Sequence, residues 1–247
     1  MTETARGKVS IVVPAYAEER RIGPAVVALK AFAAEFPRLT EVLVVVEPSG
    51  DRTADVARDA AGAGRLFTII ENDVHRGKGH AVRTGMMRAA GDIIIFMDTD
   101  LSVPLEYVRA FVAHLDAHIE TDIAIGNRRH PSSNIARRQH PLRENAGCLF
   151  NRVARGLGLT ASDDTQCGFK AFRRKAAREV FRRARLDGFS FDVEVLLIAR
   201  ILGFHVDELP VEWLNDEDTK FRPFRDGWRS LFELLRLRAS ARKAARS

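Results

Sequence analysis

Two acidic side chains, Asp98 and Asp100, stand on alternate residues directly after the apolar run Asp92–Met97. Carboxylates with this spacing at the end of a strand can project toward one divalent cation, either directly or through water. Mg²⁺ and Mn²⁺ prefer oxygen ligands and keep open positions for phosphate oxygens. A cation at this point neutralises the charge that develops on a diphosphate leaving group. The pattern alone also fits two solvated acids in a turn, so the surrounding elements decide between these interpretations.

The segment His75–Gly79, with the sequence HRGKG, is a second candidate for contact with phosphate. Its two glycines allow close backbone approach, and a helix expected from about residue 80 offers free N–H groups to anions. Arg76 and Lys78 add positive charge. The spacing is not that of a P-loop, and an ordinary glycine turn with exposed basic side chains explains the same residues.

Two further acidic pairs lie in the second half of the chain. Asp163 and Asp164 precede the polar cluster TQCGFK, where an acid can act as general base or hold an acceptor. A helix N-cap or an Asx-turn explains the same pair. Asp192 and Glu194 open an expected helix and complement its dipole, so capping is the default interpretation there.

The formal net charge of +6 arises from 39 Lys and Arg against 33 Asp and Glu, and the arginines crowd the chain from Arg128 onward. Such an excess favours an anionic partner: phosphate groups, nucleic acid or an acidic membrane surface. The long segment Asn127–Glu144 is basic and has no obvious periodicity. A second basic segment, Lys220–Arg225, interleaves aromatic residues with its charges and is a candidate loop over a diphosphate.

The first hundred residues alternate short apolar runs with helical spacing, which predicts a parallel sheet with helices on both faces. In such sheets ligands bind beyond the carboxyl ends of the strands, and this places Asp98 and His75–Gly79 where chemistry is expected. The expected strands are Val9–Pro14, Glu41–Val46, Arg65–Glu71 and Asp92–Met97, and the expected helices are Ile22–Phe36, Thr53–Ala61 and about 80–90.

The second half is less regular, and with 247 residues we expect one α/β domain over residues 1–247. Its two cysteines have no metal-ligand spacing, and no run resembles a signal peptide or a membrane span, so we expect a cytoplasmic protein. The expected helices are Pro104–His118, Asn145–Leu157, Asp192–Leu202 and a basic amphipathic helix at about 227–246, and the expected strands are Asp122–Gly126 and His205–Pro210.

Taken together, these segments resemble the inverting glycosyltransferases of family 2, which have the GT-A fold. The start VSIVVPAYAEERRI, the loop HRGKGHAVRTG and the segment DIIIFMDTDLSVP are similar to three family elements in the family's order. The later segments DTQCGFKAFRR, GFSFDVEVLLIAR, PVEW and TKFRPF are similar to dolichyl-phosphate β-glucosyltransferases and their bacterial polyprenyl-phosphate relatives. The resemblance covers about Val9 to Arg238.

The resemblance implies a role for particular residues. Asp98, Thr99 and Asp100 would carry the diphosphate, with Mg²⁺ or Mn²⁺ at the two acids. Asp164 and Gln166 would face the sugar and acceptor, and Asp164 is the candidate base if the acceptor is an alcohol. The residues that would line the nucleotide pocket or lie near its diphosphate are Pro14, Ala15, Tyr16, Glu18, Glu47, Lys78, Lys220 and Arg222.

One segment departs from the family pattern. After the second strand the family has V-D-D-G-S-x-D-x-T, whereas this chain has Val46–Thr53, one residue shorter, with Glu47 and Pro48 at the two acidic positions. His75 and His80 also replace the usual Asn and Gly.

The resemblance implies transfer of a hexose, with glucose from UDP-glucose as our expectation, to a polyprenyl or dolichyl phosphate. That anionic acceptor needs no strong base, and arginines between Arg128 and Arg143 would pair with its phosphate. The helices at 145–157 and 227–246 either lie on an anionic bilayer, as a peripheral contact on the inner face of the membrane, or pack on the domain.

Three alternatives remain open at the level of sequence. The same chemistry on a soluble small-molecule acceptor is favoured by the lack of an apparent membrane anchor. A nucleotidyltransferase would carry a glycine- and lysine-rich loop after the first strand, where this chain reads AYAEERR. A nucleic-acid-binding module is the weakest, because no such motif is present and Asp98 and Asp100 would repel a phosphate backbone. We therefore expect no nucleic-acid partner.

Overall fold

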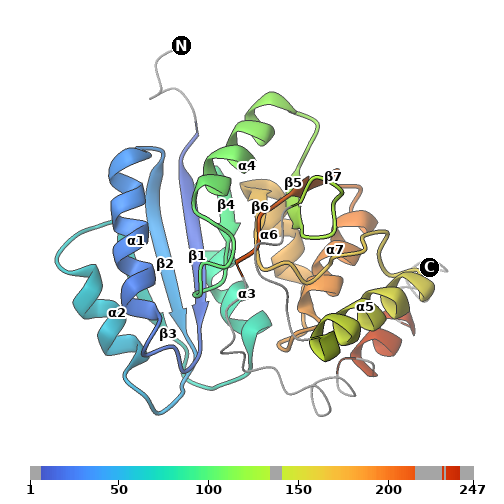
Figure 1. The fold of residues 1–247 in the computed structure, drawn as a ribbon, viewed down its shortest axis with the longest axis horizontal. Coiled ribbons are helices and arrows are strands. Elements are labelled where there is room, and N and C mark those ends of the chain that lie inside the picture. Colours follow the sequence, from blue (N-terminus) through green and yellow to red (C-terminus); the bar gives the residue numbers. More distant parts are fainter. Residues whose placement is uncertain (1–6, 134–140, 215–229, 231, 240–247) are drawn as a thin grey trace.

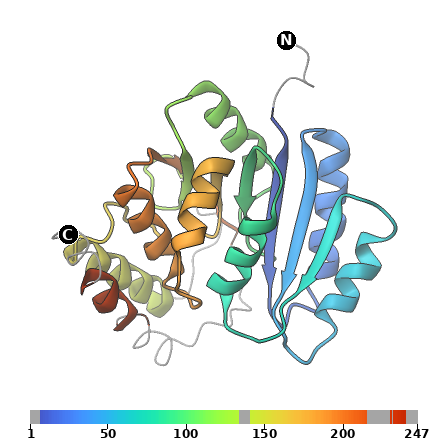
Figure 2. The same cartoon turned by 180° about the vertical axis from the view of Figure 1, so that it is seen from behind.

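The structure is a computed structural model of the 247-residue chain. It describes residues 7–133, 141–214, 230 and 232–239, with the backbone alone at 141–146. Figure 1 shows a central sheet with helices on both sides, and Figure 2 shows the same arrangement from behind.

The sheet has seven strands in the order β3-β2-β1-β4-β6-β5-β7. Strand β6 runs antiparallel to both of its neighbours, and the other pairings are parallel. The predicted, mostly parallel sheet is therefore confirmed. The strands are β1 (Val9–Ala15), β2 (Leu39–Val46), β3 (Phe67–Glu71), β4 (Ile93–Phe96), β5 (Ile123–Asn127), β6 (Lys170–Arg173) and β7 (Val206–Pro210).

Helices cover both faces because the central strands are apolar on both faces. All residues of β1 and β4 are buried, as expected for parallel strands with helices on each side. One face packs on α1 (Ile22–Glu35), α2 (Thr53–Ala61) and α4 (Glu106–Ala117). The other face packs on α3 (Lys78–Arg88), α6 (Arg174–Arg183) and α7 (Phe191–Ile201).

The predicted strands and helices of the first half are all present, with ends shifted by no more than two residues. The shift that matters is in α3, which begins at Lys78 rather than at His80, so Lys78 lies in the first turn of that helix. In the second half, α5 (Pro141–Gly156) begins inside the segment for which the sequence shows no periodicity. Strand β6 and helix α6 were not predicted, because the strand has only four residues and is framed by basic side chains.

Beyond the sheet, α5 and the helical residues 232–239 pack against α7. Leu234 is fully buried and forms a cluster with Ala154 of α5 and with Val193 and Leu197 of α7. The described residues of the two predicted amphipathic helices therefore pack on the rest of the fold. Within the described part of the chain, no helix has the length and apolar content needed to cross a membrane.

The topology brings one end of many strands to a single edge of the sheet. The ends of β1 and β2 point to the lower edge in Figure 1. Strand β4 is parallel to β1, and β5 is parallel to β4 because both run antiparallel to β6. The residues after β1, β2, β3, β4, β5 and β7, and those before β6, therefore meet at this edge, which we call the carboxyl edge.

A glycine in α3 allows that helix to approach the sheet closely. A Cβ on Gly85 would lie within 3.0 Å of Val45 and still nearer to Val12, both in the central strands. We predict that Gly85→Ala lowers the free energy of unfolding by about 1–3 kcal/mol, because an added methyl overpacks the core. Gly156→Ala, in the last turn of α5 with open space around it, is the matched control and should stabilise by up to about 1 kcal/mol. Chemical denaturation measures both; equal effects would contradict the packing.

Candidate active site

Asp98 follows β4 and forms an ion pair with Lys78 from the first turn of α3. The Lys78 Nζ lies 2.6 Å from Asp98 Oδ1. Loss of hydration works against the charge of Lys78, but Asp98 and then Asp192 outweigh it, so the pKa of Lys78 is raised. Gly168 makes room for this carboxylate, since a Cβ there would overlap Asp98. Lys78, which was predicted to lie near the nucleotide, is thus paired with the first acid of the turn.

Thr99 and Asp100 form the turn after Asp98. The buried Thr99 donates a hydrogen bond of 2.8 Å from Oγ1 to the carbonyl of Pro14, which joins the ends of β4 and β1. Asp100 accepts a 2.9 Å hydrogen bond from the backbone N–H of Ser102. Leu101 between them has a φ of +50°, a left-handed conformation that is uncommon for a leucine and that turns the chain back at this point.

The charge at this turn suits a divalent cation. Asp100 is exposed, yet the surrounding protein removes part of its hydration, and this, together with the charge of Asp98, raises the pKa of Asp100. Two carboxylates that oppose each other's ionisation gain from a shared cation. Among the described residues no group of three or more acidic, His or Cys side chains converges, and this turn carries two carboxylates, Asp98 and Asp100. That number fits Mg²⁺ or Mn²⁺, which are often bound by one or two carboxylates plus waters and phosphate oxygens.

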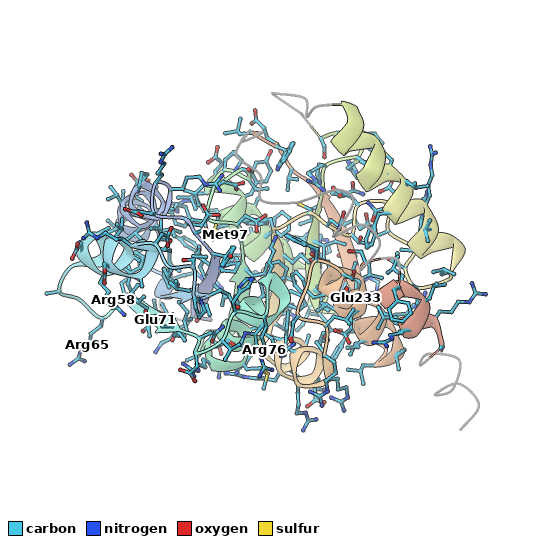
Figure 3. All side chains as sticks on the ribbon, turned by 90° about the horizontal axis from the view of Figure 1, so that it is seen from below. Arg58, Arg65, Glu71, Arg76, Met97 and Glu233 are labelled. Atoms are coloured by element: carbon cyan, nitrogen blue, oxygen red, sulfur yellow. The ribbon has the colours of Figure 1, made fainter. Side chains whose placement is uncertain are left out.

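Tyr16 and His75 form an aromatic stack beside this turn. Their ring centroids are 4.1 Å apart with 19° between the planes, and both side chains are about two-fifths exposed. Pro14 and Ala15, just before Tyr16, are buried at the end of β1. Figure 3 views the carboxyl edge from below, with the labelled Arg76 and Met97 near the middle.

Glu18 lies in the loop that leads from β1 to α1. Its carboxylate pairs with Arg21 at 2.6 Å and 3.0 Å, and its backbone N–H donates to Thr53 Oγ1 at 2.8 Å. The hydroxyl of Thr53 in turn donates to Asp51 at 2.7 Å. The loops after β1 and β2 are thus bonded to each other.

The two glycines of the HRGKG segment serve contacts within the chain. Gly77 has a φ of +126°, and a Cβ on it would lie 2.6 Å from the carbonyl oxygen of Asp187. A Cβ on Gly79 would come equally close to Leu186 and Phe191. The close backbone approach expected for an anion is therefore an approach to the segment that leads into α7. The helix start of α3 faces that segment, and the His80 N–H donates to the carbonyl of Asp187 at 3.3 Å.

Asp164 is fully buried and holds Arg128, the first residue after β5. Arg128 donates to it from Nε at 2.8 Å, from Nη2 at 2.7 Å and from the backbone N–H at 2.8 Å. Burial opposes the ionisation of Asp164, but Arg128 outweighs it, so the pKa of Asp164 is lowered. The guanidinium of Arg128 also lies 5.1 Å from the ring centroid of Trp213. Asp164 thus lies at the carboxyl edge, its predicted role toward the acceptor stays a prediction, and its partner was not foreseen.

A second buried ion pair joins β6 to α7. Lys170 Nζ lies 2.5 Å from Asp192 Oδ1, and both residues are almost completely buried. Burial raises the pKa of Asp192, and the lysines Lys170 and Lys78 counteract it. Glu194, two residues further on, accepts hydrogen bonds from the backbone N–H groups of Arg185 and Leu186 at 2.9 Å and 2.7 Å. These acids thus hold neighbouring segments in place, beyond the capping expected from their position.

A small pocket opens between Asp98, Gly168 and Trp213, and it is lined in addition by Met97, Leu101, Ser102, Val103 and Phe169. Gln166 is half-buried in the segment that leads to β6. Trp213 was not predicted as a site residue; the PVEW motif was the only signal for it. Lys220 and Arg222, both predicted near the diphosphate, lie outside the described residues, as do Arg137 and Arg138.

Comparison with known sequences identifies related proteins. The profile of "Glycosyl transferase family 2" matches residues 10–181. The chain is 34% identical over 231 residues to dolichyl-phosphate beta-glucosyltransferase of Drosophila melanogaster, which covers 88% of this chain and 70% of that protein. The human protein of that name is 32% identical with the same coverage. A Trichomonas vaginalis relative is 33% identical, over 86% of this chain and 66% of its own length. The chain thus spans about two thirds of the length of these relatives.

Solved structures share the fold at low sequence identity. Glucosyl-3-phosphoglycerate synthase from Mycobacterium tuberculosis, in a complex with Mn²⁺, UDP and phosphoglyceric acid, has a TM-score of 0.71 and 16% identity, over 97% of this chain and 80% of that chain. A mycobacterial protein has a TM-score of 0.73 with 17% identity, over 96% of this chain and 76% of that chain. The likeness establishes the fold as GT-A, as predicted.

The buried pair of Arg128 and Asp164 should matter for stability. We predict that Asp164→Asn lowers the free energy of unfolding by about 3 kcal/mol, because it leaves the partly buried guanidinium of Arg128 without its counter-charge. The Asp55→Asn variant, in α2 with a largely exposed carboxylate, is the control and should change stability by less than about 0.5 kcal/mol.

The pH dependence of that difference has a defined sign. The folded-state pKa of Asp164 is lowered, so its contribution is complete above the unfolded pKa of about 3.9 and is lost as the pH falls through the folded-state pKa. Urea unfolding of wild type and Asp164→Asn between neutral and acidic pH measures the difference. If the difference in the free energy of unfolding between the two proteins stays constant or grows on acidification, the charge of the Asp164 carboxylate is not what stabilises the fold.

Proposed function

The chain belongs to glycosyltransferase family 2, and on that premise we propose that it transfers a hexose, with inversion, from a nucleotide-diphosphate sugar to a polyprenyl or dolichyl phosphate. The observation that carries the proposal is the convergence of Asp98, Asp100 and Lys78 at the carboxyl edge. Opposed carboxylates beside a lysine are suited to hold a cation and a diphosphate together. The curated relatives that match most of the chain are named dolichyl-phosphate beta-glucosyltransferases, which favours this donor and acceptor.

We assign Asp98 and Asp100 to Mg²⁺ or Mn²⁺. When bound, the cation supplies Lewis acidity that offsets charge on the leaving diphosphate. Thr99 holds the turn against β1 through its bond to Pro14, and Lys78 provides a positive charge directed at the same point. Structures of glucosyl-3-phosphoglycerate synthase with Mn²⁺ or Mg²⁺ and UDP support the use of such a cation by this fold.

We assign the donor nucleotide to the neighbouring loops. Tyr16 follows β1 at the carboxyl edge and is about two-fifths exposed, and an aromatic ring of this kind can stack on a base. Glu18 is engaged with Arg21, so it contributes by fixing the loop after β1. UDP-glucose is the expected donor, since UDP-glucose occupies a solved structure of this fold. The assignments of Gln166, Lys220 and Arg222 to the donor stay predictions.

Arg128 is the residue we assign to the acceptor phosphate. Asp164 fixes its guanidinium through two side-chain hydrogen bonds, and a held guanidinium binds phosphate with little loss of rotamer freedom. A phosphate oxygen is already anionic when it attacks the sugar, so this acceptor requires no general base. The lowered pKa of Asp164 makes its carboxylate a weak base, which favours the phosphate acceptor over an alcohol.

We further propose that α5 and the helix at 232–239 touch an anionic bilayer in a peripheral fashion. Leu149, Phe232 and Leu235 are each at least half exposed on these two helices. Arg152 and Arg155 are exposed on α5, and Arg236 lies 4.3 Å above the Phe232 ring centroid. Exposed apolar side chains among arginines are typical of helices at a headgroup surface. An enzyme for a lipid acceptor would gain from such a contact.

The function is tested at Asp100. We predict that Asp100→Asn lowers the rate of glucose transfer from UDP-glucose to a polyprenyl phosphate by about 100-fold or more, because a carboxylate that acts on the diphosphate is lost. Chelation of divalent cations by EDTA should have the same effect on wild type. Radiolabelled transfer assays measure both, with Asp55→Asn as the control at wild-type rate. Full activity of Asp100→Asn would refute the assignment.

The membrane contact has a separate test. We predict that Leu235→Asp lowers the fraction of protein that co-sediments with phosphatidylserine vesicles and reduces the affinity about tenfold or more. A leucine side chain that becomes buried in the bilayer on binding contributes about 1.5–3 kcal/mol, and the aspartate loses this contribution. Ile119→Asp is the matched control, since Ile119 is exposed but lies at the amino end of β5, on the opposite side of the sheet. If the wild-type protein does not bind anionic vesicles, the result would instead point to a soluble acceptor.

A further inference from the structure

Glu47 is an acidic residue at the carboxyl edge, and the function proposed above assigns it no role. It follows β2 directly, and its side chain is 1% exposed. The family pattern leads one to expect an acid here that contacts the nucleotide base. A carboxylate this deeply buried reaches only what already surrounds it, so its neighbours show what it does.

Among the described residues, the hydrogen-bond partners of the Glu47 carboxylate come from the segment between β3 and the first turn of α3. At Oε1, Asn72 Nδ2 lies at 2.6 Å and His80 Nδ1 at 2.8 Å. At Oε2, the backbone N–H groups of Arg76 and Gly77 donate at 2.6 Å and 3.2 Å. The two ends and the middle of the loop are thus fixed to one side chain.

These four contacts use the full accepting capacity of an ionised carboxylate, which is about four lone-pair sites. His75 Nδ1 adds a fifth close nitrogen at 3.3 Å from Oε2. Burial by itself would raise the pKa of Glu47, but the hydrogen bonds from Arg76, Asn72, Gly77 and His80 outweigh it and lower the pKa. The carboxylate is therefore ionised and satisfied within the chain.

The loop that Glu47 fixes carries two groups of the donor site. Lys78 directly follows Gly77 and reaches Asp98 at 2.6 Å. His75 directly precedes Arg76 and stacks on Tyr16. Both groups are one residue away from a backbone N–H that Glu47 holds, so a change at Glu47 displaces both.

We propose that Glu47 is a positioning residue, which holds the loop 72–80 so that Lys78 faces Asp98 and His75 faces Tyr16, and that it does not contact the nucleotide base. The inference rests on the proposed function, since it takes the acidic turn and its lysine as the diphosphate site. Base selectivity then belongs to groups other than Glu47. Loss of the carboxylate acts on the diphosphate through Lys78 and on the Tyr16 ring through His75, and stacking on an aromatic ring is open to every nucleotide base.

Nucleotide binding without turnover tests the proposal. Isothermal titration calorimetry measures the Kd of UDP, GDP and dTDP, each with Mn²⁺, for wild type, Glu47→Gln and Glu71→Gln. Glu71 is the matched control, because it ends the adjacent strand β3 but is about half exposed and pairs with Arg58, well to the side of Arg76 in Figure 3. We expect Glu47→Gln to weaken all three nucleotides by a similar factor of about tenfold, with their order of affinity unchanged. Glu71→Gln should bind like wild type.

A double-mutant cycle with Lys78→Ala adds a measurement that a general loss of stability would not move. If Glu47 positions Lys78, then Lys78→Ala weakens UDP binding less in the Glu47→Gln background than in wild type. Asn72→Ala removes one donor and leaves the carboxylate in place, and it serves as the milder variant if Glu47→Gln does not fold. Its expected effect is again equal for the three nucleotides, and smaller.

Two results overturn the proposal. One is a change in the order of UDP, GDP and dTDP affinity in Glu47→Gln that is absent from Asn72→Ala, which would mean that the Glu47 side chain itself contacts the base. The other is full additivity with Lys78→Ala, which would mean that the two residues act independently. Neither result touches the proposed function, which fails in a different way: wild type itself would bind no nucleoside diphosphate with Mn²⁺.

Discussion

The site depends on the rule that a buried charge must have a partner. A carboxylate or ammonium group taken out of water without a counter-charge costs several kcal/mol, so each such group at the carboxyl edge is paired. Each pairing also joins two segments that are distant in sequence, and this fixes the edge as one unit. The pairs are Lys78–Asp98, Arg128–Asp164 and Lys170–Asp192, and Glu47 is paired with the loop 72–80.

The same pairing suits the phosphate chemistry that we propose for the edge. Positive groups such as Lys78 and Arg128 are held at fixed positions by acids beneath or beside them, so little reorganisation is needed when an anion arrives. Asp100 differs from these pairs, because loss of hydration and the neighbouring charge of Asp98 both oppose its ionisation and raise its pKa. An acid opposed by a second acid thus stands where a divalent cation is expected. The same turn therefore contains one acid that is paired with a lysine, Asp98, and one acid whose ionisation is opposed by its neighbour, Asp100.

The sequence predicted the sheet, its main helices and the acidic turn because these follow from local patterns. Apolar runs such as Val9–Pro14 specify buried strands, and the two acids after β4 stand where ligands bind in such sheets. What sequence did not predict depends on contacts between distant residues. The partner of Asp164 is 36 residues away, and Glu47 meets its donors 25 to 33 residues further on. The short β6 is visible only from its pairing with β4 and β5.

The contact between Gly77 and the carbonyl of Asp187 has a consequence for protein engineering. The loop 72–80 is bonded at both ends to Glu47 and packs closely on the segment before α7, so it cannot be exchanged on its own without losing these contacts. To exchange residues 72–80 for those of a relative, one must also exchange residue 47 and residues 186–188. A graft of this loop therefore has to include all three segments to keep their contacts. A library that randomises residues 72–80 alone leaves residue 47 and residues 186–188 unchanged, so most of its loop sequences lose those contacts.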